Sequence, residues 1–560
     1  MRGSDFIAEC LADEGVETAF TVSAENISPL LKSLLVKGIK LVNSKLELSA
    51  AFMAVIYSRV KRLPGLLVVT AGPGVIGSLS PIAAAMVEGD PLVVIGGFPS
   101  DDGKTSHMHQ LVKRGDQMEL MKPVTKTQYR IECYDQISSC ISKAFVDSAS
   151  DKPGPVYVEL SVDLLVEDGV RVEYVKGRIR KPKLDSGSVK LVADLLEKAG
   201  LPVIIAGRGV YLAEGENELI SVAELLGAPI TTTIMAKGLI PNEHPLYAGV
   251  AAGRTGDATA QTVISRADVV LAVGNRFSEM GTGRYSLKIN GSLVHVNIDG
   301  NEIGRTFKPE IAIISDAKEF LSSLLKELSS RKYSYKINNE SMLSIIREKE
   351  SQEIERFYSE AKTDLIESFE VVKAVREMAE KDAIFICDVG AHRVETFIMP
   401  VYISGTYVTT TSYISMGLAV PGAVAASIEY PNKQVFGIVG DGGFLMTGLE
   451  IATAVEYGAK PIIVVFNDSS YKVLRIYEHV KYHSDTRELY KIPKVDFSKI
   501  ADALGAKGIS VEKREDLYPS IKNALDWNKG PVVLDVKINP QGIPIPFQRL
   551  YGHRYIKDLN

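Results

Sequence analysis

Short apolar runs recur along the whole chain, and each is followed by a stretch whose apolar positions recur at helical spacing. Examples are "GLLVVT" and "PLVVIGG" in the first third, "PVIIAG" and "DVVLAVG" in the middle, and "AIFICDVG" and "PVVLDVKI" in the last third. A short continuous apolar run predicts a strand that is buried on both faces. Because such strands alternate with predicted helices, the pattern indicates parallel sheets covered by helices, which is an α/β fold.

Two polar stretches divide this pattern into three parts. The first is the basic, proline-containing "GRIRKPKLDSGS", and the second is the charged "SSRKYSYKINNESMLSIIREKESQEIERF", which we interpret as a solvated connection with some helix. The first and third parts are similar in length and style, as if one sheet design were used twice. The expected organisation is a domain over residues 1–176, a linker over 177–190, a central domain over 191–330, a connection over 331–362, a C-terminal domain over 363–545 and a tail over 546–560.

Composition and charge exclude several classes of protein. At 560 residues the chain is too long for one hydrophobic core. The net charge of -5 is spread over both signs, which argues against a nucleic-acid partner, and the four cysteines lack the Cys-x-x-Cys spacing of a zinc site. The N-terminal segment is amphipathic and acidic rather than a signal peptide, and no apolar run reaches the roughly 18 residues of a membrane span. We therefore predict a cytoplasmic protein with no nucleic-acid or membrane partner.

The segment over residues 440–471, "GDGGFLMTGLEIATAVEYGAKPIIVVFNDSSY", places an acidic residue after each of two predicted strands. Between the strands we predict one helix that ends at Gly458. Its apolar face is expected to carry Leu445, Leu449, Ala452 and Val455. A strand–helix–strand unit of this kind makes its strands parallel, joined by a right-handed crossover. Asp441 and Asp468 should therefore lie at the same edge of a sheet.

The positions of these two aspartates suggest a specific chemistry. The carboxyl ends of parallel strands are where α/β sheets bind ligands, and Asp441 and Asp468 are 27 positions apart. If their strands are neighbours, the carboxylates can share a magnesium ion, which usually takes one or two carboxylates and completes its shell with phosphate and water. Gly442 and Gly443 would leave backbone N–H groups free to approach a phosphate. We predict a magnesium–diphosphate site, with a strand-to-helix turn that has an acidic N-cap as the alternative.

Taken together, the two aspartates make this segment similar to the motif of thiamine-diphosphate-dependent enzymes, which reads Gly-Asp-Gly, a helix and a strand, then Asn-Asn. The resemblance implies that Asp441, Asp468 and the backbone carbonyl of Ser470 hold magnesium. Asp468 stands where the family usually has asparagine, which adds a negative charge beside a diphosphate. The resemblance covers nearly the whole chain. It implies a pyrimidine-binding, a central Rossmann-like and a diphosphate-binding domain, in that order.

Other segments carry the same resemblance. In "SYISMGLAVPGAVAASIEYPNKQVFGIVGDGG", Met416 stands where the family has an apolar residue that holds the cofactor in a bent shape. "DVGAHR" is similar to the diphosphate-binding segment of acetohydroxyacid synthases, with Ala391 in place of their usual glutamine, and "VVTAGPGVIGSL" is similar to the family's glycine-rich turn. The resemblance implies cofactor contacts from Gly72, Pro73, Gly74, Gly390, Ala391, His392, Met416, Asp441, Gly442, Gly443, Asp468, Ser470 and Tyr471.

A glutamate in the first domain is the candidate for the central acid–base group. Glu47 in "LVNSKLELSAAFMAVIYSR" follows a predicted strand and precedes an alanine-rich helix that ends in Tyr-x-Arg. The resemblance implies that Glu47 hydrogen-bonds the pyrimidine ring of the cofactor. Leu46 and Leu48 flank it, and an apolar setting would favour its protonated form. The alternative is structural, because Ser44-x-x-Glu47 is also a capping box.

Three further residues are candidates for catalytic proton transfer. Glu25 in "TVSAENISPLL" stands where pyruvate decarboxylases carry a catalytic aspartate. His107 and His109 fall in the segment where those enzymes have adjacent histidines. For each of these residues the alternative is a solvated loop position. Against a pyruvate decarboxylase, Leu474 stands where that group keeps a glutamate.

The segments "GAPITTTIMAKGLIPNEHPLYAGV" and "LAVGNRFSEMGTGR" are most similar to acetohydroxyacid (acetolactate) synthases. This implies an enzyme that decarboxylates a 2-oxo acid, or ligates the resulting aldehyde-level unit to an acceptor, with thiamine diphosphate and Mg²⁺. "DQMELMKPVTK" fits benzaldehyde lyase and 2-hydroxyacyl-coenzyme A lyases equally well, and the synthases' Phe-Gln-Glu before it is absent. A lyase or decarboxylase of the benzoylformate decarboxylase kind is the alternative. A non-catalytic relative that binds the cofactor is the alternative from another class.

Three points stay open on sequence alone. "AGRGVYLAEG" lacks a clear Gly-x-Gly-x-x-Gly, so the central domain is compatible with FAD, ADP, coenzyme A or no second cofactor. The tail carries Arg549, His553 and Arg554 among aromatic residues and fits either a lid or a docked surface segment. In this family the glutamate of one chain meets the metal site of another. The resemblance therefore implies a homodimer or a dimer of dimers, a homotetramer.

Overall fold

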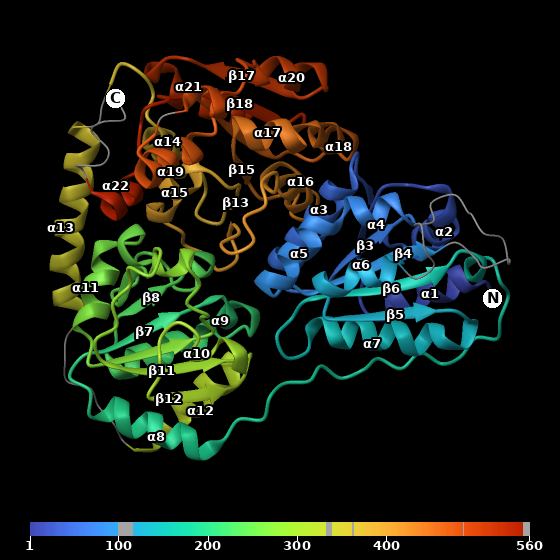
Figure 1. The fold of residues 1–560 in the computed structure, drawn as a ribbon, viewed down its shortest axis with the longest axis horizontal. Coiled ribbons are helices and arrows are strands. Elements are labelled where there is room, and N and C mark those ends of the chain that lie inside the picture. The colour runs from blue at the N-terminus through green and yellow to red at the C-terminus, as the bar shows by residue number, and fades with distance from the viewer. Residues whose placement is uncertain (99–115, 332–338, 361–362, 485, 553–560) are drawn as a thin grey trace. The chain divides into compact units, whose positions relative to one another are not determined.

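The computed structural model describes residues 1–98, 116–331, 339–360, 363–484 and 486–552 (Figure 1). The chain forms two compact units. The first lies within residues 1–180, 413–431 and 447–459, and the second within 181–412, 432–446 and 460–560. Three parallel sheets of six strands are found in these described residues, one in the first unit and two in the second. Helices flank each sheet, so the predicted α/β fold with three parallel-sheet domains is confirmed.

The first unit is built on a sheet with strand order β2-β1-β3-β4-β6-β5. Its strands are β1 (Thr18–Thr21), β2 (Lys40–Asn43), β3 (Gly65–Val69), β4 (Leu92–Phe98), β5 (Thr127–Ile131) and β6 (Pro155–Ser161). Its helices include α1 (Gly3–Asp13), α2 (Ser28–Val36), α3 (Glu47–Lys61), α4 (Pro73–Gly77), α5 (Leu79–Glu88), α6 (Asp116–Met121), α7 (Ile137–Ala149), α16 (Ala419–Glu429) and α18 (Ile451–Glu456). Alternate strand residues face opposite sides: Leu66 packs with α1 and α7, and Leu67 packs with α3 and α5 (Figure 1).

The second unit holds the central and the C-terminal sheets. The central strands are β7 (Pro202–Ala206), β8 (Ile230–Thr232), β9 (Tyr247–Val250), β10 (Val269–Val273), β11 (Ser292–Asn297) and β12 (Ile311–Ile314). The C-terminal strands are β13 (Ile384–Cys387), β14 (Tyr407–Val408), β15 (Val435–Gly440), β16 (Ile462–Asn467), β17 (Lys507–Val511) and β18 (Val532–Lys537). The principal helices are α8 (Ser186–Glu197), α9 (Arg208–Leu212), α10 (Glu216–Leu226), α11 (Ala258–Arg266), α12 (Ala317–Ser330), α13 (Asn339–Glu360), α14 (Ser368–Met378), α15 (Ala391–Glu395), α17 (Asp441–Thr447), α19 (Lys472–Tyr482), α20 (Phe497–Ala503), α21 (Leu517–Asp526) and α22 (Ile545–Tyr551).

The first and third sheets share one topology. The C-terminal order is β14-β13-β15-β16-β18-β17, which places its strands in the same succession as the first sheet. In both, the order reverses beside the first strand of the domain, and ligands of open α/β sheets bind at such a point. The central order, β12-β11-β10-β7-β8-β9, is that of a Rossmann fold. The expectation that one sheet design is used twice is therefore confirmed.

Most strands that the apolar runs did not reveal lie at sheet edges. β5, β9, β12, β14 and β17 are each the last strand of a sheet. β17 is largely unburied and begins with lysine and glycine, so its sequence lacks a continuous apolar run, whereas β12 is apolar but only four residues long with one of them buried. β1 lies inside its sheet but spans only four residues. The expected helical connection contains α13, which has 22 residues and only three buried ones.

The helix predicted after Asp441 is not continuous. α17 ends at Thr447, a 3₁₀ turn spans Gly448–Glu450, and α18 follows. The break falls where the chain passes from the second unit into the first. Gly458 does adopt the expected left-handed conformation, with φ of 63°. On the predicted apolar face, however, Leu445, Leu449 and Val455 are exposed by 47%, 66% and 39%.

All four cysteines are free. None of the helices in the described part of the chain combines the length and the apolar character that a bilayer-crossing segment needs. In the second unit, the buried Lys237 donates hydrogen bonds to the carbonyl oxygens of Thr396, Phe397 and Met399 at 2.6, 2.7 and 2.7 Å. This lysine therefore ties the central domain to the turn that follows α15.

The first unit contains one ion pair that is almost fully buried. Arg59 Nη2 lies 2.8 Å from Asp90 Oδ2, and the two side chains are 3% and 0% exposed. Replacing Arg59 by methionine would leave the Asp90 carboxylate buried without its cation. We expect Arg59→Met to cost about 3–5 kcal/mol of unfolding free energy, because such a charge cannot regain its hydration.

The measurement is the urea midpoint followed by circular dichroism. Lys37→Met is the matched control, because the pair of Lys37 with Glu9 is partly exposed and is expected to contribute about 1 kcal/mol or less. Equal, small losses in both variants would contradict the prediction.

Candidate active site

The two predicted metal ligands lie at the carboxyl ends of adjacent strands. Asp441 directly follows β15 and Asp468 directly follows β16, and these strands pair in parallel. β13, whose end leads to Gly390, pairs with the other side of β15. The order of the C-terminal sheet reverses between β13 and β15. The topology therefore brings the "DVGAHR" and Gly-Asp-Gly segments to one ligand-binding edge.

One backbone amide joins the two carboxylates. The Ser470 N–H lies 3.1 Å from both Asp441 Oδ2 and Asp468 Oδ1, so these oxygens can be no further apart than twice that distance. Ser469 has a φ of 57°, a left-handed conformation that costs energy for a residue with a Cβ and that turns the chain sharply after β16. Burial and the nearby charge of Asp468 raise the pKa of Asp441 to about 7. The pair is a concentrated negative site suited to one hard cation.

The charge added by Asp468 has a partner that the sequence analysis missed. Lys472 Nζ lies 2.8 Å from Asp468 Oδ2, and both side chains are nearly buried, at 5% and 6% exposed. Asp468 Oδ1 accepts instead from the Ser470 backbone and hydroxyl groups. The four-residue spacing between Asp468 and Lys472 is the only sequence signal for this pair, and such spacings are too common to be diagnostic.

Glycine is required beside the aspartates. A Cβ on Gly442 would lie 2.4 Å from the ring of Tyr471, and one on Gly443 would lie 2.9 Å from Val439. The expectation that the Gly442 N–H is free is wrong for this structure, because that group donates to Asp441 Oδ1 at 2.7 Å. The N–H instead fixes the orientation of the first carboxylate.

His392 completes this part of the site. Its ring is buried and stacks on Phe466 with centroids 5.5 Å apart, and Nε2 has no hydrogen-bond partner among the described residues. Burial, followed by the charges of Arg393 and Lys472, lowers its pKa to about 3, so the imidazole is neutral. Gly390, at φ of 151°, allows this approach, because a Cβ there would lie 2.5 Å from the ring. An unpartnered buried nitrogen beside a cation site fits an oxygen-rich ligand such as a diphosphate.

The first unit gathers the other predicted residues. Glu47 is the first residue of α3, and a Cβ on Gly77 would lie 3.3 Å from the Glu47 Cβ, so Glu47 packs against the glycine-rich turn. The capping-box alternative is wrong, because Leu46 is the N-cap and makes no side-chain cap hydrogen bond. Leu46 is also 42% exposed, so the expected apolar setting is not closed on that side within one chain.

The glycine-rich turn is itself held by a buried side chain. Gly72, at φ of 63°, precedes α4, which begins at Pro73. The Gly72 N–H donates to Gln117 Oε1 at 2.8 Å, and Gln117 Nε2 donates to Glu159 and to the Gly97 carbonyl. Gln117 lies in "DQMELMKPVTK", a segment that the sequence analysis used only for classification.

Other predicted residues have different surroundings. Met416 is half-buried, and its neighbour Ser415 lies 3.0 Å from Ser80 of α5, hydroxyl to hydroxyl. Glu25 is exposed at the start of a 3₁₀ turn, Glu25–Ile27. His107 and His109 lie outside the described residues.

Glu450 supports the turn before Glu47. Its carboxylate is buried, and Oε1 accepts from Ser44 Oγ at 2.9 Å and from the Lys45 N–H at 3.0 Å. Oε2 accepts from Thr453 Oγ1 at 2.8 Å. Because Glu450 follows the Gly-Asp-Gly segment by only a few residues, one stretch of chain contributes to both groups of predicted site residues.

Comparison with known sequences decides the family. The chain matches the N-terminal TPP binding domain of thiamine pyrophosphate enzymes over residues 1–120, their central domain over 189–324 and their C-terminal TPP binding domain over 388–536. The chain belongs to the thiamine diphosphate-dependent enzymes. Similar proteins include a probable acetolactate synthase large subunit of Methanocaldococcus jannaschii, 28% identical over 96% of this chain and 92% of that protein. The acetolactate synthase of Bacillus subtilis is 25% identical over 96% of this chain and 93% of that protein. The acetolactate synthase of Mycobacterium bovis is 28% identical over 96% of this chain and 88% of that protein.

This thiamine diphosphate enzyme therefore acts on carbon–carbon bonds, as its family does. Three observations show that the residues predicted for the diphosphate end fit the cofactor. The two carboxylates converge, the His392 nitrogen has no partner among the described residues, and glycines leave room where a Cβ would meet the rings of Tyr471 and His392. Within the described residues, no group of three His, Cys, Asp or Glu side chains is placed to hold a metal. A magnesium ion here would thus depend on two carboxylates and a backbone carbonyl, as the family motif implies.

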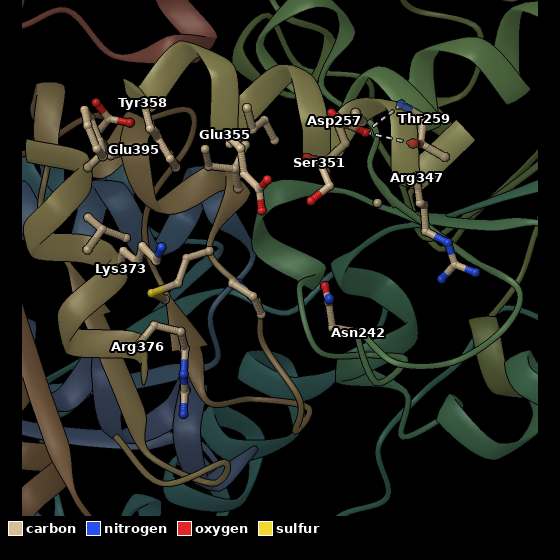
Figure 2. Close-up of a pocket in the computed structure, with 18 of the residues that line it drawn as sticks. Asn242, Asp257, Thr259, Arg347, Ser351, Glu355, Tyr358, Lys373, Arg376 and Glu395 are labelled. Atoms are coloured by element: carbon tan, nitrogen blue, oxygen red, sulfur yellow. Dashed lines mark hydrogen bonds between the residues drawn. The ribbon is translucent and has the colours of Figure 1, made fainter. Parts of the chain in front are cut away.

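The enzyme has a cavity of about 460 Å³ between β9, α13 and α14 (Figure 2). Asp257, Arg347 and Glu395 are among the residues that line it, and no predicted cofactor residue is. Glu395 is the last residue of α15, the helix that begins beside the diphosphate segment. We therefore treat this cavity as separate from the active site.

The central domain and the tail were left open by the sequence, the first for a second cofactor and the second for a role as a lid. A Cβ on Gly207 or Gly209 would lie 2.2 or 2.6 Å from Gly274, so these glycines allow close packing of the ends of β7 and β10. They therefore do not distinguish a flavin site from plain packing. Arg549 of α22 lies 3.1 Å from Glu350, and α22 is docked by buried apolar residues, whereas residues 553–560 lie outside the described part.

The support that Glu450 gives to the Glu47 turn can be tested directly. Glu450→Ala removes the acceptor of the Lys45 N–H, and a buried hydrogen bond of this kind contributes about 1 kcal/mol. We expect the Lys45 amide to exchange with deuterium roughly fivefold faster or more, measured by mass spectrometry of the peptide that contains it. Glu450→Gln keeps an acceptor oxygen and is the matched control. Unchanged exchange in Glu450→Ala would show that the contact does not stabilise the turn.

Proposed function

We propose that this enzyme uses thiamine diphosphate and Mg²⁺ to decarboxylate a 2-oxo acid and to ligate the aldehyde-level product to an acceptor. This is the kind of reaction that the name of its acetolactate synthase relatives describes. The observation that carries the proposal is the shared Ser470 amide, which holds Asp441 and Asp468 together beside the unpartnered His392 nitrogen. The similarity to acetolactate synthases along 96% of the chain supports the reaction class.

In this proposal the residues of the second unit bind the diphosphate end of the cofactor. Asp441, Asp468 and the Ser470 carbonyl would hold Mg²⁺, and the neutral His392 would hydrogen-bond a phosphate oxygen. Gly390, Ala391, Gly442, Gly443 and Tyr471 would form the walls. When bound, thiamine diphosphate supplies a carbon nucleophile and then accepts the electron pair released as the bond beside the carbonyl breaks.

The residues of the first unit would serve the other end of the cofactor. Glu47 would hold a proton at the ring nitrogen of the pyrimidine, the Gly72–Pro73–Gly74 turn would line the substrate side, and Met416 would support the bent cofactor. Glu25 and His107 remain proposed proton-transfer groups for the later steps.

We also propose that the enzyme works as a homodimer or a dimer of such dimers. Apolar side chains around the Glu47 turn are exposed in the single chain, namely Leu46 (42%), Ile76 (45%), Leu449 (66%) and Val455 (39%). Grouped exposed apolar residues of this kind mark interaction surfaces. A second copy that covers them would also exclude water from the surroundings of Glu47.

The reaction is tested by product analysis. Purified enzyme with thiamine diphosphate, Mg²⁺ and pyruvate is expected to release carbon dioxide and form a 2-hydroxy-3-oxo acid such as acetolactate, and a panel of 2-oxo acids would define the substrate. Aldehyde alone would instead favour the benzoylformate decarboxylase kind of enzyme, and no turnover on any substrate would favour a non-catalytic relative. An absorption spectrum of the same sample determines whether FAD is bound.

The role of Glu47 is tested by Glu47→Gln. The amide keeps the size of the side chain but holds a proton on the pyrimidine far less well, and acid–base help of this kind is worth about 10²–10⁴-fold in rate. We expect exchange of the thiazolium C2 hydrogen of the bound cofactor for deuterium, followed by NMR, to slow within this range. The thermal melt should stay near that of the wild type, because Glu47 does not cap α3.

Glu17→Gln is the matched control, since Glu17 is 65% exposed. It should leave the exchange rate unchanged. Wild-type exchange in Glu47→Gln would remove this glutamate from the mechanism.

A further inference from the structure

Lys472 occupies an unusual position for a buried lysine. It is the first residue of α19, four positions after Asp468, and its ammonium group bonds Asp468 Oδ2 at 2.8 Å and the Asn539 carbonyl oxygen at 2.7 Å. Its charge also acts on His392 and Glu395. The lysine therefore lies at the centre of the diphosphate end of the site rather than at its surface.

The two oxygens of the Asp468 carboxylate have different partners. Oδ2 faces the ammonium group, and Oδ1 shares the Ser470 amide with Asp441. A lone carboxylate at this position would repel both Asp441 and a bound diphosphate in a site with little water, where charges act strongly. An aspartate and a lysine together carry the same net charge as the asparagine that is usual in the family.

We propose that Lys472 is a positioning residue that neutralises Asp468, so that an aspartate can act as a magnesium ligand beside a diphosphate. This inference rests on the proposed function. It also makes a prediction for Asp468→Asn. The amide oxygen alone would make that change harmless, but with Lys472 present it leaves a buried ammonium group without its counter-charge.

The test is a double-mutant cycle of Lys472→Met, Asp468→Asn and the double variant. Two quantities are measured by fluorescence titration, the Kd of thiamine diphosphate at saturating Mg²⁺ and the Mg²⁺ concentration for half-maximal uptake of the cofactor. Lys472→Met should raise the Kd about 10–100-fold, because the uncompensated Asp468 carboxylate then repels the diphosphate at short range in a site with little water. It should also lower the Mg²⁺ requirement, because an extra negative charge attracts the cation.

Asp468→Asn should raise the Mg²⁺ requirement, since Lys472 would then repel the cation. The double variant should return both quantities to within about threefold of the wild type, because its net charge is restored. A role in packing alone would not shift the Mg²⁺ requirement in opposite directions. Lys537→Met is the matched control: Lys537 pairs with the buried Asp535 at 2.7 Å in the same domain. It should lower the melting temperature without changing either binding quantity.

Two results would overturn the inference. Equal Mg²⁺ requirements in all four proteins would make the pair structural, and a double variant as weak as Lys472→Met would mean that Lys472 binds the diphosphate directly. If Lys472→Met does not fold, the comparison of Asp468→Asn with the double variant still decides, because only charge compensation predicts recovery in the double. A wild-type protein that takes up no cofactor at any Mg²⁺ concentration would instead overturn the proposed function itself.

Discussion

The mutual repulsion of two buried carboxylates is the constraint on which the C-terminal domain depends. Asp441 and Asp468 converge because β15 and β16 are adjacent and parallel, and burial beside Asp468 raises the pKa of Asp441 to about 7. Three groups hold the arrangement in place: the shared Ser470 amide, the Gly442 amide and the Lys472 ammonium group. Each comes from the turn or the first helical residues that directly follow one of the two strands. The same segments carry the left-handed Ser469 and the glycine that makes room for Tyr471. A cation between the carboxylates would relieve their repulsion, so the arrangement favours the binding of a metal ion.

The repeated sheet topology explains why the predicted residues fall into two groups. In both the first and the third sheet, the strand order reverses beside the first strand of the domain, and the predicted residues follow the strands around that point. In the first sheet these are the Glu47 turn after β2 and the glycine-rich turn after β3. In the third they are the His392 segment after β13 and Asp441 after β15. One architecture thus provides an acid–base group in one unit and a cation–diphosphate group in the other.

The chain between Asp441 and Gly458 contributes to both groups of predicted residues. Asp441 belongs to one group, Glu450 supports the turn before Glu47 in the other, and the helix is broken between them. The 3₁₀ turn Gly448–Glu450 belongs to the first unit, where Glu450 accepts hydrogen bonds from Ser44 and Lys45. Gly448, a poor helix-forming residue, stands at the break, and the buried Glu450 carboxylate that follows it accepts hydrogen bonds from partners about 400 positions away in the sequence.

The sequence by itself determined the α/β class, the buried strands and the two aspartates, because continuous apolar runs and the Gly-Asp-Gly spacing are local patterns. It did not reveal edge strands such as β17, whose partly exposed sequence lacks a continuous apolar run. It favoured a role for Glu47 but could not exclude a capping box, since the choice depends on whether the N-cap of α3 is Leu46 or Ser44. Lys472, Glu450 and Gln117 were decided only by the tertiary structure. Their importance comes from a partner that folding brings within hydrogen-bond distance, and for a buried charge or polar group the energy depends on that partner rather than on the residue type.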